Sequence, residues 1–423
     1  MQYVWRFRLW PEVRMTTADG RRVDVIDPGE LNTGSGPDFF NAKVRIDGRV
    51  WAGNIEIHVR ASDWFRHGHD TDPAYDNVIL HVVQYDDRPV CRRTDGVVIP
   101  QVTMVCAPDF SARYQAMVGN PLVELPCASE IQSLPPILLT DWLTSLAFER
   151  LQRKADDIHR LLDACYGDWN QVVYITVARG LGFGINADAM EQLARLMPLK
   201  YLLHHSDDEV ALEAMLMGVG GLLETAAPRD DYERLLIGEY AFYTRKYNLA
   251  PATVPQWGAR IRPHNHPTRR IAQLAALIYG GFQLPGQILS LTDAKEGSGI
   301  IFGNAISPYW RDHQMLGGPK VQLPPHLGKS SGDLLLINVV APLLYAYGEQ
   351  HADYDRREIA VEIWQNVRGE VNSLTRVFTN AGLKCPDAFT SQAYIQLRRN
   401  YCSARKCLFC RIGHKLLQAK VRP

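Results

Sequence analysis

The sequence predicts an α+β or α/β protein of two or three domains, in which a sheet comes first and helices follow. At 423 residues, the chain is too long for one typical hydrophobic core. Runs of β-branched residues with turn signals concentrate before about residue 126, and after residue 136 the apolar residues recur at helical spacing. We therefore expect a sheet domain over 1–130, a mainly helical domain over 137–384, and a basic, cysteine-rich tail over 385–423.

Four segments of the first region have the alternation and the β-branched content of strands. They cover residues 21–26, 42–46, 50–59 and 78–84. Asp47-Gly48 separates the second segment from the third and is a typical two-residue hairpin turn. The second and third strands are therefore expected to be antiparallel neighbours.

The middle region has the apolar spacing of helices. From Thr140, which can cap a helix, apolar residues share one face as far as Leu162. Further helices are expected at residues 187–196, 209–223, 231–245, 269–279, 332–347 and 356–378. Gly382 suits the end of the last one, because glycine accepts the left-handed conformation that often follows a helix.

Composition indicates an ordinary globular protein of a reducing compartment. The 46 Lys and Arg residues balance 46 Asp and Glu, which excludes a uniformly basic nucleic-acid coat. Eight cysteines are too few for a disulfide scaffold in a chain of this length. The longest apolar stretch, 334–347, is shorter than the roughly 20 residues that span a bilayer. With no secretory signal after Met1, we expect a cytoplasmic protein outside the membrane.

Candidate chemistry is densest between residues 36 and 83. Four of the 13 histidines lie within 24 residues: His58, His67, His69 and His81. Acidic residues are interleaved with them: Asp38, Glu56, Asp63, Asp70 and Asp72. Carboxylates and imidazoles both donate lone pairs to divalent cations, so this segment is a candidate metal site.

Strand geometry sharpens this expectation. Glu56 and His58 are two residues apart in a strand, so they point to the same side of the sheet, away from Ile57. A hairpin at Asp47-Gly48 brings Asp38 back beside Glu56. Two carboxylates placed in this way could hold one Mg²⁺, with a third group positioned to handle a proton.

A Pro-Asp pair at the head of one strand, with an acidic-x-basic triplet about eighteen residues later, resembles the PD-(D/E)xK restriction-endonuclease-like superfamily. The resemblance implies a mixed sheet of that type, with Pro37-Asp38 as the first motif and Glu56-Ile57-His58 as the second. It also implies that the two acids hold Mg²⁺ or Mn²⁺ while the third residue assists the attacking water. His58 stands where Lys is usual. Many members carry a Glu on a helix before the first strand, a role for which the chain offers Glu12 alone.

A second resemblance is broader. Segments such as GPDFFNAK, GNIEIH, SDWFRHGHD and RIRPHNHPTRR, together with the C-terminal YCSARKCLFCRIG, resemble an uncharacterised bacterial family known as a domain of unknown function. This resemblance spans nearly the whole chain and implies no particular activity.

Three function classes follow from these residues. The first is a Mg²⁺-dependent nuclease in which His58 acts as base or hydrogen-bond donor, and His67 and His69 contact phosphate or the leaving oxygen. The second is a non-catalytic nucleic-acid-binding or scaffold protein that keeps the fold without the chemistry. The third is a metal-dependent hydrolase of another substrate that uses His67 and His69.

Structural interpretations stand beside these. Asp38 can cap a turn after Gly36-Pro37, and Glu56 can pair with Arg45 or Arg60 on a solvated face. His67 and His69 can join His81 in a separate zinc site, while His81 alone is more often a hydrogen-bonded interior histidine.

The C-terminal cysteines form a second candidate metal site. Cys402, Cys407 and Cys410 lie within nine residues, and the last two have the spacing of a zinc knuckle. His414 or Cys385 could supply the fourth ligand, and either Zn²⁺ or an iron–sulfur cluster would suit such donors. Some PD-(D/E)xK nucleases carry a C-terminal iron–sulfur staple of this kind. The alternative is that the three thiols are simply reduced.

Two basic segments predict contact with a polyanion. Residues 388–423 contain eight Lys and Arg but no Asp or Glu. The nucleic-acid-binding candidates in this segment are Arg398, Arg399, Arg405, Lys406 and Arg411. A second group, Arg262, Arg269 and Arg270, could bind phosphate or dock on an acidic helix. The tail could equally lie against the acidic body of its own chain.

Overall fold

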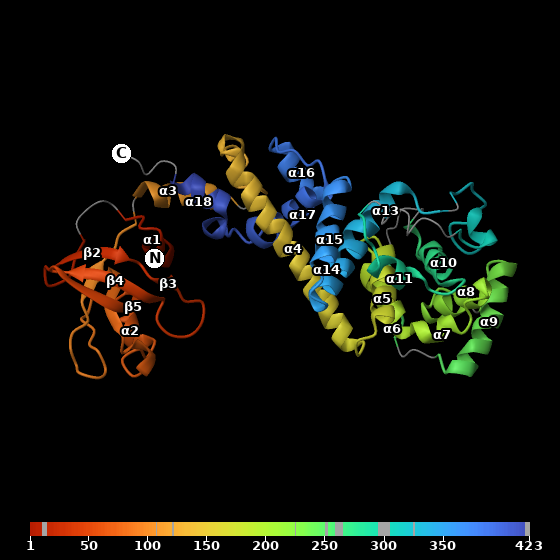
Figure 1. The fold of residues 1–423 in the computed structure, drawn as a ribbon, viewed down its shortest axis with the longest axis horizontal. Helices are drawn as coiled ribbons and strands as arrows, with labels where there is room; N and C mark the ends of the chain where they lie inside the picture. Colours follow the sequence, from red (N-terminus) through yellow and green to blue (C-terminus); the bar gives the residue numbers. More distant parts are fainter. Residues whose placement is uncertain are drawn as a thin grey trace. The chain divides into compact units, whose positions relative to one another are not determined.

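The structure, a computed structural model, describes residues 1–10, 15–106, 108–120, 122–224, 226–249, 253–258, 265–294, 305–324 and 326–418. It confirms a mixed sheet near the N-terminus and a helical remainder (Figure 1). The chain forms two compact units. The sheet unit combines residues 1–131 with the segment that begins at Tyr401, and the helical unit comprises residues 132–400. The predicted tail is therefore divided between the two units at Tyr401.

A seven-stranded mixed sheet forms the centre of the sheet unit. Its strands are β1 (Met15–Thr16), β2 (Arg22–Asp27), β3 (Glu30–Leu31), β4 (Phe39–Ile46), β5 (Arg49–Arg60), β6 (Val78–Tyr85) and β7 (Gln101–Thr103). They are ordered β1-β2-β4-β5-β6-β7, and β3 pairs with β4. Pairing is antiparallel from β1 to β5 and parallel from β5 to β7. The four expected strands correspond to β2, β4, β5 and β6.

The β4–β5 hairpin determines the register of the candidate site. Its turn is Asp47-Gly48, as predicted, and both residues have positive φ angles (45° and 81°), which is the requirement of a tight two-residue turn. A bulge interrupts the pairing between Phe39 and Ala42. Beyond it Phe39 pairs with Ile55, which places Asp38 beside Glu56.

Short helices and the C-terminal segment pack on this sheet. The helical elements of the sheet unit are α1 (Gln2–Arg6), α2 (Asp63–Arg66), α3 (Pro108–Val118), α18 (Arg411–Gln418) and the 3₁₀ turns Pro73–Tyr75 and Cys407–Phe409. Leu408 and Leu417 from the end of the chain join the same apolar core as Trp5 and Val44. Removal of these apolar side chains from water holds the C-terminal segment to the sheet unit.

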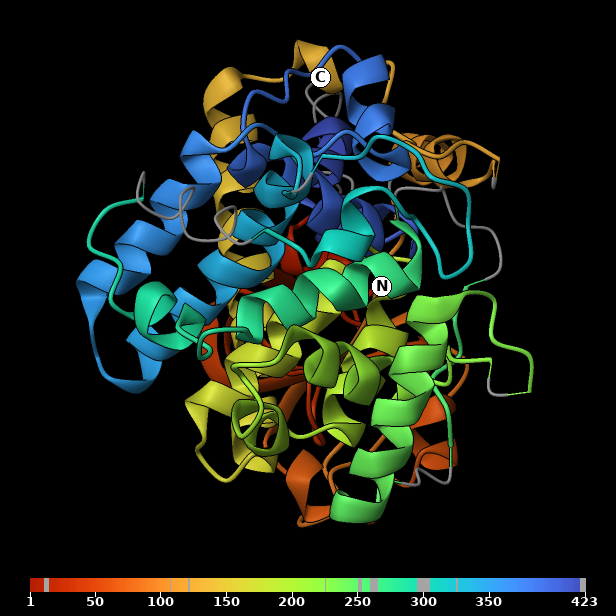
Figure 2. The ribbon, with the colours of Figure 1, turned by 90° about the vertical axis from the view of Figure 1, so that its right-hand side faces the viewer.

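The helical unit packs its helices around one large apolar core (Figure 1 and Figure 2). The α-helices are α4 (Pro136–Ala164), α5 (Trp169–Leu181), α6 (Ala187–Leu196), α7 (Leu199–Leu203), α8 (Glu209–Val219), α9 (Asp231–Tyr247), α10 (Pro267–Ile278), α11 (Leu284–Leu289), α13 (Lys329–Leu335), α14 (Ala341–Gln350), α15 (Tyr354–Asn366), α16 (Ser373–Asn380) and α17 (Ala388–Leu397). Leu146, Leu151 and Leu162 on α4 are buried, as their spacing predicts, although α4 begins at Pro136 rather than at Thr140.

The helix expected over 356–378 is wrong as a single element. It is two helices, α15 and α16, which are separated by an extended segment at Val367. A side chain at Gly369 would lie 2.7 Å from the carbonyl oxygen of Asp387, so only glycine allows the close approach of these backbones. Asn372 then caps α16 through a capping box with Thr375. The helical spacing of apolar residues continues across this break, so the sequence pattern does not reveal it.

The long apolar stretch lies in the core of the helical unit. Lys329–Gln350 combines α13, a π-helical turn (Leu336–Val340) and α14. Among the described helices, it is the one long and apolar enough to cross a membrane by length and composition, but 72% of its most apolar window is buried inside the protein. Such burial is typical of a core helix.

Candidate metal centre

Three candidate residues meet across the β4–β5 hairpin. Asp38 precedes β4, while Glu56 and His58 lie on β5 and alternate with the core residues Ile55 and Ile57. Glu56 and His58 are only 5% and 6% exposed. Two ionisable side chains are thus buried together on the side of β5 that faces away from the apolar core, an arrangement that is costly unless partners satisfy them.

The carboxylates of Asp38 and Glu56 are held by backbone and amide donors. The Asp38 N–H donates to Glu56 Oε2 (3.0 Å), and the Ile57 N–H donates to Asp38 Oδ2 (3.1 Å). Gln2 on α1 donates its amide to Asp38 Oδ1 at 2.5 Å. Each acid therefore contacts the backbone of the other strand, which fixes both carboxylates at the junction of β4 and β5.

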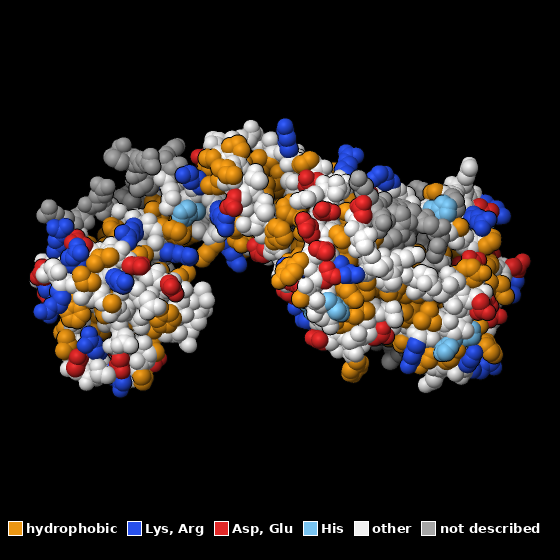
Figure 3. All heavy atoms as spheres, viewed as in Figure 1, with side chains coloured by type: hydrophobic (Ala, Val, Ile, Leu, Met, Phe, Trp, Pro, Cys, Tyr) orange, Lys and Arg blue, Asp and Glu red, His pale blue; other side chains and the backbone are white. Residues whose placement is uncertain are grey.

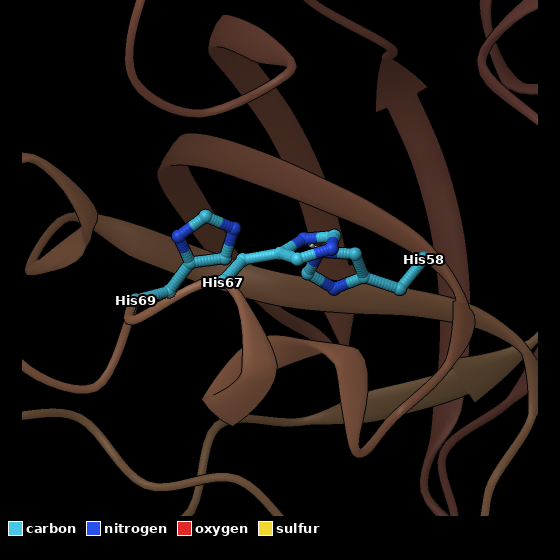
Figure 4. Close-up of side chains that lie close together, drawn as sticks. All are labelled: His58, His67 and His69. Carbon is cyan, nitrogen blue, oxygen red and sulfur yellow. Dashed lines mark hydrogen bonds between the residues drawn. The ribbon is translucent and has the colours of Figure 1, made fainter.

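Three histidines, His58, His67 and His69, lie close together (Figure 4), and two of them contact Glu56. His58 reaches from β5, while His67 and His69 come from the turn after α2, in which Gly68 has a φ of 75°. Their ligand atoms all lie within 4.8 Å of one another. His58 and His69 are close to Glu56 Oε1, each at 3.4 Å from Nε2. Within the described part of the chain, Glu56 thus contacts histidines in place of the expected alternatives Arg45 or Arg60.

The spacing of these atoms suits one transition-metal ion. Nitrogen and oxygen ligands that lie about 2.0–2.1 Å from a tetrahedral ion are about 3.4 Å apart. Nε2 of His58 is 3.2 Å from Nδ1 of His67 and 3.4 Å from Oε1 of Glu56. The residues that fit a cation here are therefore Glu56, His58, His67 and His69, with Asp38 adjacent to Glu56 rather than within the histidine group.

A chain of hydrogen bonds determines which nitrogen of His58 faces this group. Gln101 donates its amide N–H to Asp86 (2.7 Å) and to the carbonyl of Arg88 (3.1 Å), so its oxygen faces His81 and must accept from His81 Nδ1 (3.0 Å). His81 Nε2 is then the acceptor for His58 Nδ1–H at 2.8 Å. His58 is left with Nε2 directed at His67 and Glu56, as a metal-ligating histidine requires.

Burial favours the uncharged forms of these groups. It lowers the pKa of His58 to about 3, with neighbouring histidines adding to the shift, and lowers that of His81 to about 4. Burial also lowers the pKa of His69. Burial and the nearby Asp38 raise the pKa of Glu56 to about 8. Burial therefore favours the neutral form of His58, His69 and His81, and the lone pair of a neutral imidazole can bind a metal.

Sequence reasoning missed several members of this site. No sequence pattern indicates Gln2 or Gln101, and the sequence alone predicts that His81 is an interior histidine or a ligand of a separate zinc site. His81 is fully buried and contacts Nδ1 of His58, whereas His67 contacts Nε2 of the same ring. Its position on the strand next to His58 follows from the parallel pairing of β5 with β6, in which Glu56 stands beside His81.

The structure also places the cysteine candidates. Cys402, Cys407 and Cys410 are buried and line one small cavity in the sheet unit, together with Cys127. His414 is hydrogen-bonded to Tyr3 (2.6 Å) and does not line this cavity. Cys385 belongs to the helical unit and does not line it either.

The arginine candidates separate into buried and accessible residues. Arg269 and Arg270 are 4% and 6% exposed, and Arg269 donates to the carbonyls of Trp310 and Pro324. Arg270 donates to Gln273 and Asn265. Their guanidinium groups hold loops of the helical unit together, so the expectation that they form a nucleic-acid surface is corrected. Arg262 lies outside the described residues.

The basic residues near the chain's end are more accessible. Arg399, Lys406 and Arg411 are exposed, whereas Arg398 and Arg405 are half-buried. Arg405 donates to the carbonyl of Asn120 at 3.1 Å. The accessible residues remain candidates for contact with a polyanion.

A hollow of about 470 Å³ lies elsewhere, in the helical unit. Lys154, Arg179, Arg195 and Asn338 are among the residues that line it. Arg179 and Arg195 both form ion pairs with Glu191, which also lines the hollow. None of the predicted site residues within the described ranges lines this hollow, so the strongest cluster of chemistry and this cavity are separate features.

Comparison with known proteins places the chain in a family without assigning an activity. The family described as protein of unknown function (DUF2851) matches residues 1–373. No curated protein matches the chain, and no solved structure does. The matched residues include Asp38, Glu56 and the histidines, whereas Cys402, Cys407 and Cys410 lie beyond them. Because the match covers most of the sequence, the protein belongs to the DUF2851 family.

Proposed function

We propose that the protein is a metal-dependent hydrolase that cleaves phosphodiester bonds in nucleic acid. The observation that carries this proposal is the convergence of His58, His67 and His69, with Glu56 Oε1 at 3.4 Å from both His58 and His69 and with Asp38 next to Glu56. Burial favours a proton on Glu56, and a bound cation would take the place of that proton between the carboxylate and the imidazole lone pairs.

The restriction-endonuclease-like resemblance supports the same proposal. Asp38 at the head of β4 and Glu56 on β5 meet across two antiparallel strands, as the two motifs require. His58 differs from the usual Lys because its Nε2 faces His67 and Glu56, so it is better suited to bind the cation than to act as a base. Gln2 on α1 contacts Asp38 from the helix before the first strand, where many members of that superfamily carry Glu.

The nitrogen-rich ligand set indicates which ion to expect. Mg²⁺ favours oxygen ligands, whereas imidazole suits Mn²⁺, Zn²⁺ and other transition metals. Three histidines and one carboxylate therefore favour Mn²⁺ or Zn²⁺ over Mg²⁺. The original expectation of an ion held by Asp38 and Glu56 alone is replaced by one held mainly by Glu56 and the histidines.

The chain's own residues have distinct roles in this hydrolysis. A divalent cation supplies Lewis acidity and lowers the pKa of a bound water. His81 and Gln101 hold the His58 ring in the orientation that presents Nε2. Asp38, fixed by Gln2 and the Ile57 N–H, keeps a carboxylate beside the ion site, where it can accept the proton of the attacking water. His67 is exposed and leaves that side of the group accessible to a substrate.

A polyanionic substrate is supported by basic residues on the same face of the hairpin. Alternation along β5 directs Ala52, Glu56 and His58 to one side, and Lys43 stands opposite Ala52 on that side. Arg45 follows two residues further along β4 and is also exposed. Figure 3 shows Lys and Arg side chains on the surface of the sheet unit, interspersed with acidic and hydrophobic ones. Lys43 and Arg45 could therefore contact the phosphates of a nucleic acid bound at the site.

Cleavage assays test the proposal. Purified protein, freed of metal and reloaded with Mn²⁺, Zn²⁺ or Mg²⁺, is incubated with single-stranded, double-stranded and branched DNA and with RNA. We expect cleavage with Mn²⁺ or Zn²⁺ that His67→Ala and Asp38→Ala both abolish while far-ultraviolet circular dichroism stays unchanged. Exposed Asp95→Asn, in a loop of the same unit, is the matched control and should leave cleavage intact.

The other outcomes separate the remaining function classes. Salt-sensitive binding of nucleic acid without cleavage, under every metal condition, would contradict the hydrolase and favour a non-catalytic binding protein. Loss of metal binding in His67→Ala without any cleavage by the wild type would favour a hydrolase of another substrate. Absence of both binding and cleavage would remove nucleic acid as the substrate.

A further inference from the structure

Four cysteines from two distant parts of the sequence line one cavity of the sheet unit. Cys127 follows α3, whereas Cys402, Cys407 and Cys410 come from the segment that returns near the end of the chain. The cavity has a volume of about 20 Å³. The remaining residues that line it are Met117, Pro126, Tyr401, Lys406 and Gly413. Among the side chains that line this cavity, the four thiols are therefore the main candidates for metal ligands.

The backbone around the three C-terminal cysteines is tightly organised. Lys406 N–H donates to the carbonyl of Tyr401 (2.9 Å), and Cys410 N–H donates to that of Cys407 (3.3 Å). Gly413 at the start of α18 passes so close that a side chain there would lie 2.3 Å from the Cys407 carbonyl oxygen. The segment thus folds around the cavity and is not an open tail.

The positions of the thiols are consistent with this arrangement. Cys402, Cys407 and Cys410 are 7%, 8% and 7% exposed. Cys127 lines the same cavity as Cys407 and Cys410, although they are 280 and 283 residues away in the sequence.

The two fourth ligands expected from the sequence are occupied elsewhere. His414 Nδ1 is hydrogen-bonded to Tyr3, and its ring packs against that of Phe7, with centroids 4.1 Å apart. Cys385 lies in the helical unit next to Gly369. Cys127 thus replaces both as the donor that completes a set of four.

We propose that Cys127, Cys402, Cys407 and Cys410 together bind one thiophilic metal centre, either a Zn²⁺ ion or an iron–sulfur cluster assembled from iron and sulfide. Binding converts the four thiols to thiolates and releases their protons to solvent. Among the described residues, the histidine group is the set of three or more whose ligand atoms lie within 4.8 Å. The thiols are thus more widely spaced here than the ligands of a single zinc ion. A Zn²⁺ ion would require them to move closer together, whereas an iron–sulfur core accommodates the wider spacing.

Such a centre would link two segments of the sheet unit that are far apart in the sequence. The helical unit is inserted between residues 131 and 401 of the sheet unit. Cys127 lies just before the insertion and Cys402 just after it, so a shared metal joins its two ends. This role does not depend on the proposed hydrolase activity, and its test uses a different readout.

Thiol protection in the intact wild-type protein is the main test. The full-length protein, purified without oxygen, is treated with N-ethylmaleimide before and after metal is removed by a chelator, and each cysteine is quantified by mass spectrometry. We expect Cys127, Cys402, Cys407 and Cys410 to become modified together only after metal removal. Cys91, which is exposed, should react equally in both samples. Equal labelling of the four before and after removal would overturn the proposal.

Metal analysis of variants identifies the ligands and the metal. Cys127→Ser should lose the zinc, or the iron, sulfide and visible absorbance, of this centre, whereas Cys385→Ser and His414→Ala should retain them. All of these are made in a His67→Ala background, so that metal at the histidine site is not counted. Loss of the centre in Cys385→Ser with retention in Cys127→Ser would overturn the assignment. If Cys127→Ser does not fold, the thiol protection of the wild type still decides the question.

Discussion

Glu233 of the helical unit and Glu56 of the sheet unit are both buried, but the pKa values of their carboxyl groups shift in opposite directions. In the helical unit, Glu233 is fully buried and binds the Arg229 guanidinium and two backbone N–H groups. Burial opposes its ionisation, but these donors outweigh burial and lower the pKa of Glu233 to about 2. In the sheet unit, Glu56 faces imidazole nitrogens, and burial raises its pKa to about 8.

The contrast distinguishes structural burial from a binding site. A buried acid whose donors are all supplied by the fold needs nothing further, as in Glu233. Glu56 accepts one backbone N–H, from Asp38, while its other oxygen faces the imidazoles of His58 and His69. Burial without a cationic partner disfavours the charged carboxylate. We therefore propose a cation at Glu56 and none at Glu233, and four comparisons test this difference.

The largest expected difference is in catalysis. Glu56→Ala should reduce metal-dependent cleavage by more than about 100-fold, since loss of an outer-shell partner alone typically costs about 10–100-fold. The control is Glu213→Gln, which replaces a buried acid of the helical unit. It should leave the cleavage rate within about twofold of the wild type at pH 7, because a substitution far from the metal site changes the stability of the fold rather than the reaction. Initial cleavage rates at saturating Mn²⁺ measure both. Equal losses in the two variants would remove the distinction between the units.

The second difference is in the pH dependence of stability. Burial raises the pKa of Glu213 to about 7, although Ser307, Trp310 and Tyr232 donate to its carboxylate. As the pH rises from about 4.5 to 7, the unfolded chain ionises while the native state retains the proton, so the free energy of unfolding falls and then levels off. At about 1.4 kcal/mol for each pKa unit, the loss amounts to about 3 kcal/mol.

Urea unfolding at pH 5 and pH 8, followed by circular dichroism, measures this loss. In Glu213→Gln the decline between the two pH values should be smaller than in the wild type, because that position no longer titrates. An unchanged decline would show that another group is responsible.

The third difference concerns the hydrogen-bond chain behind His58. Gln101→Leu removes the acceptor that orients His81, so His58 loses its fixed tautomer. Metal affinity should fall about 10–100-fold, which is the usual cost of losing an outer-shell partner. Isothermal titration with Mn²⁺ or Zn²⁺ measures the change, and Gln132→Leu in the helical unit, which loses a hydrogen bond to the Ala381 carbonyl, is the control. An unaltered metal affinity in Gln101→Leu would mean that the hydrogen bonds from Gln101 through His81 to His58 do not affect metal binding.

The smallest expected effect is on substrate binding. Replacing both Lys43 and Arg45 with Ala should weaken nucleic-acid binding and reduce the slope of log affinity against log salt by up to about two, since each phosphate contact contributes about 0.9. Fluorescence anisotropy at several salt concentrations gives the slope. The control is the exposed pair Arg153 and Arg160 of the helical unit, changed to Ala. A larger effect from the control pair would place the nucleic-acid surface on the helical unit instead.

Much of the candidate site could be predicted from the sequence because its parts are local. The Asp47-Gly48 turn connects Asp38 to Glu56 through a single hairpin, and a two-residue spacing in β5 places His58 beside Glu56. His67 and His69 follow within one short turn of α2. In each case, the spacing along the chain already limits the distance in space.

Other parts could not be predicted because they depend on contacts between distant segments. Arg269 has the composition of a phosphate ligand, yet its carbonyl partners lie about 40 and 55 residues away along the chain. The break between α15 and α16 follows from the approach of Asp387 to Gly369, which no apolar period reveals.

By itself, the sequence determined the sheet-then-helix order, the hairpin and the clustering of histidines with carboxylates, because side-chain periodicity and turn chemistry act over a few residues. Only the tertiary structure decided that His58 presents Nε2, that Gln2 contacts Asp38, and that Cys127 joins the C-terminal thiols. These last facts arise from packing between segments that the sequence separates by tens to hundreds of residues, and such packing leaves no periodic trace along the chain.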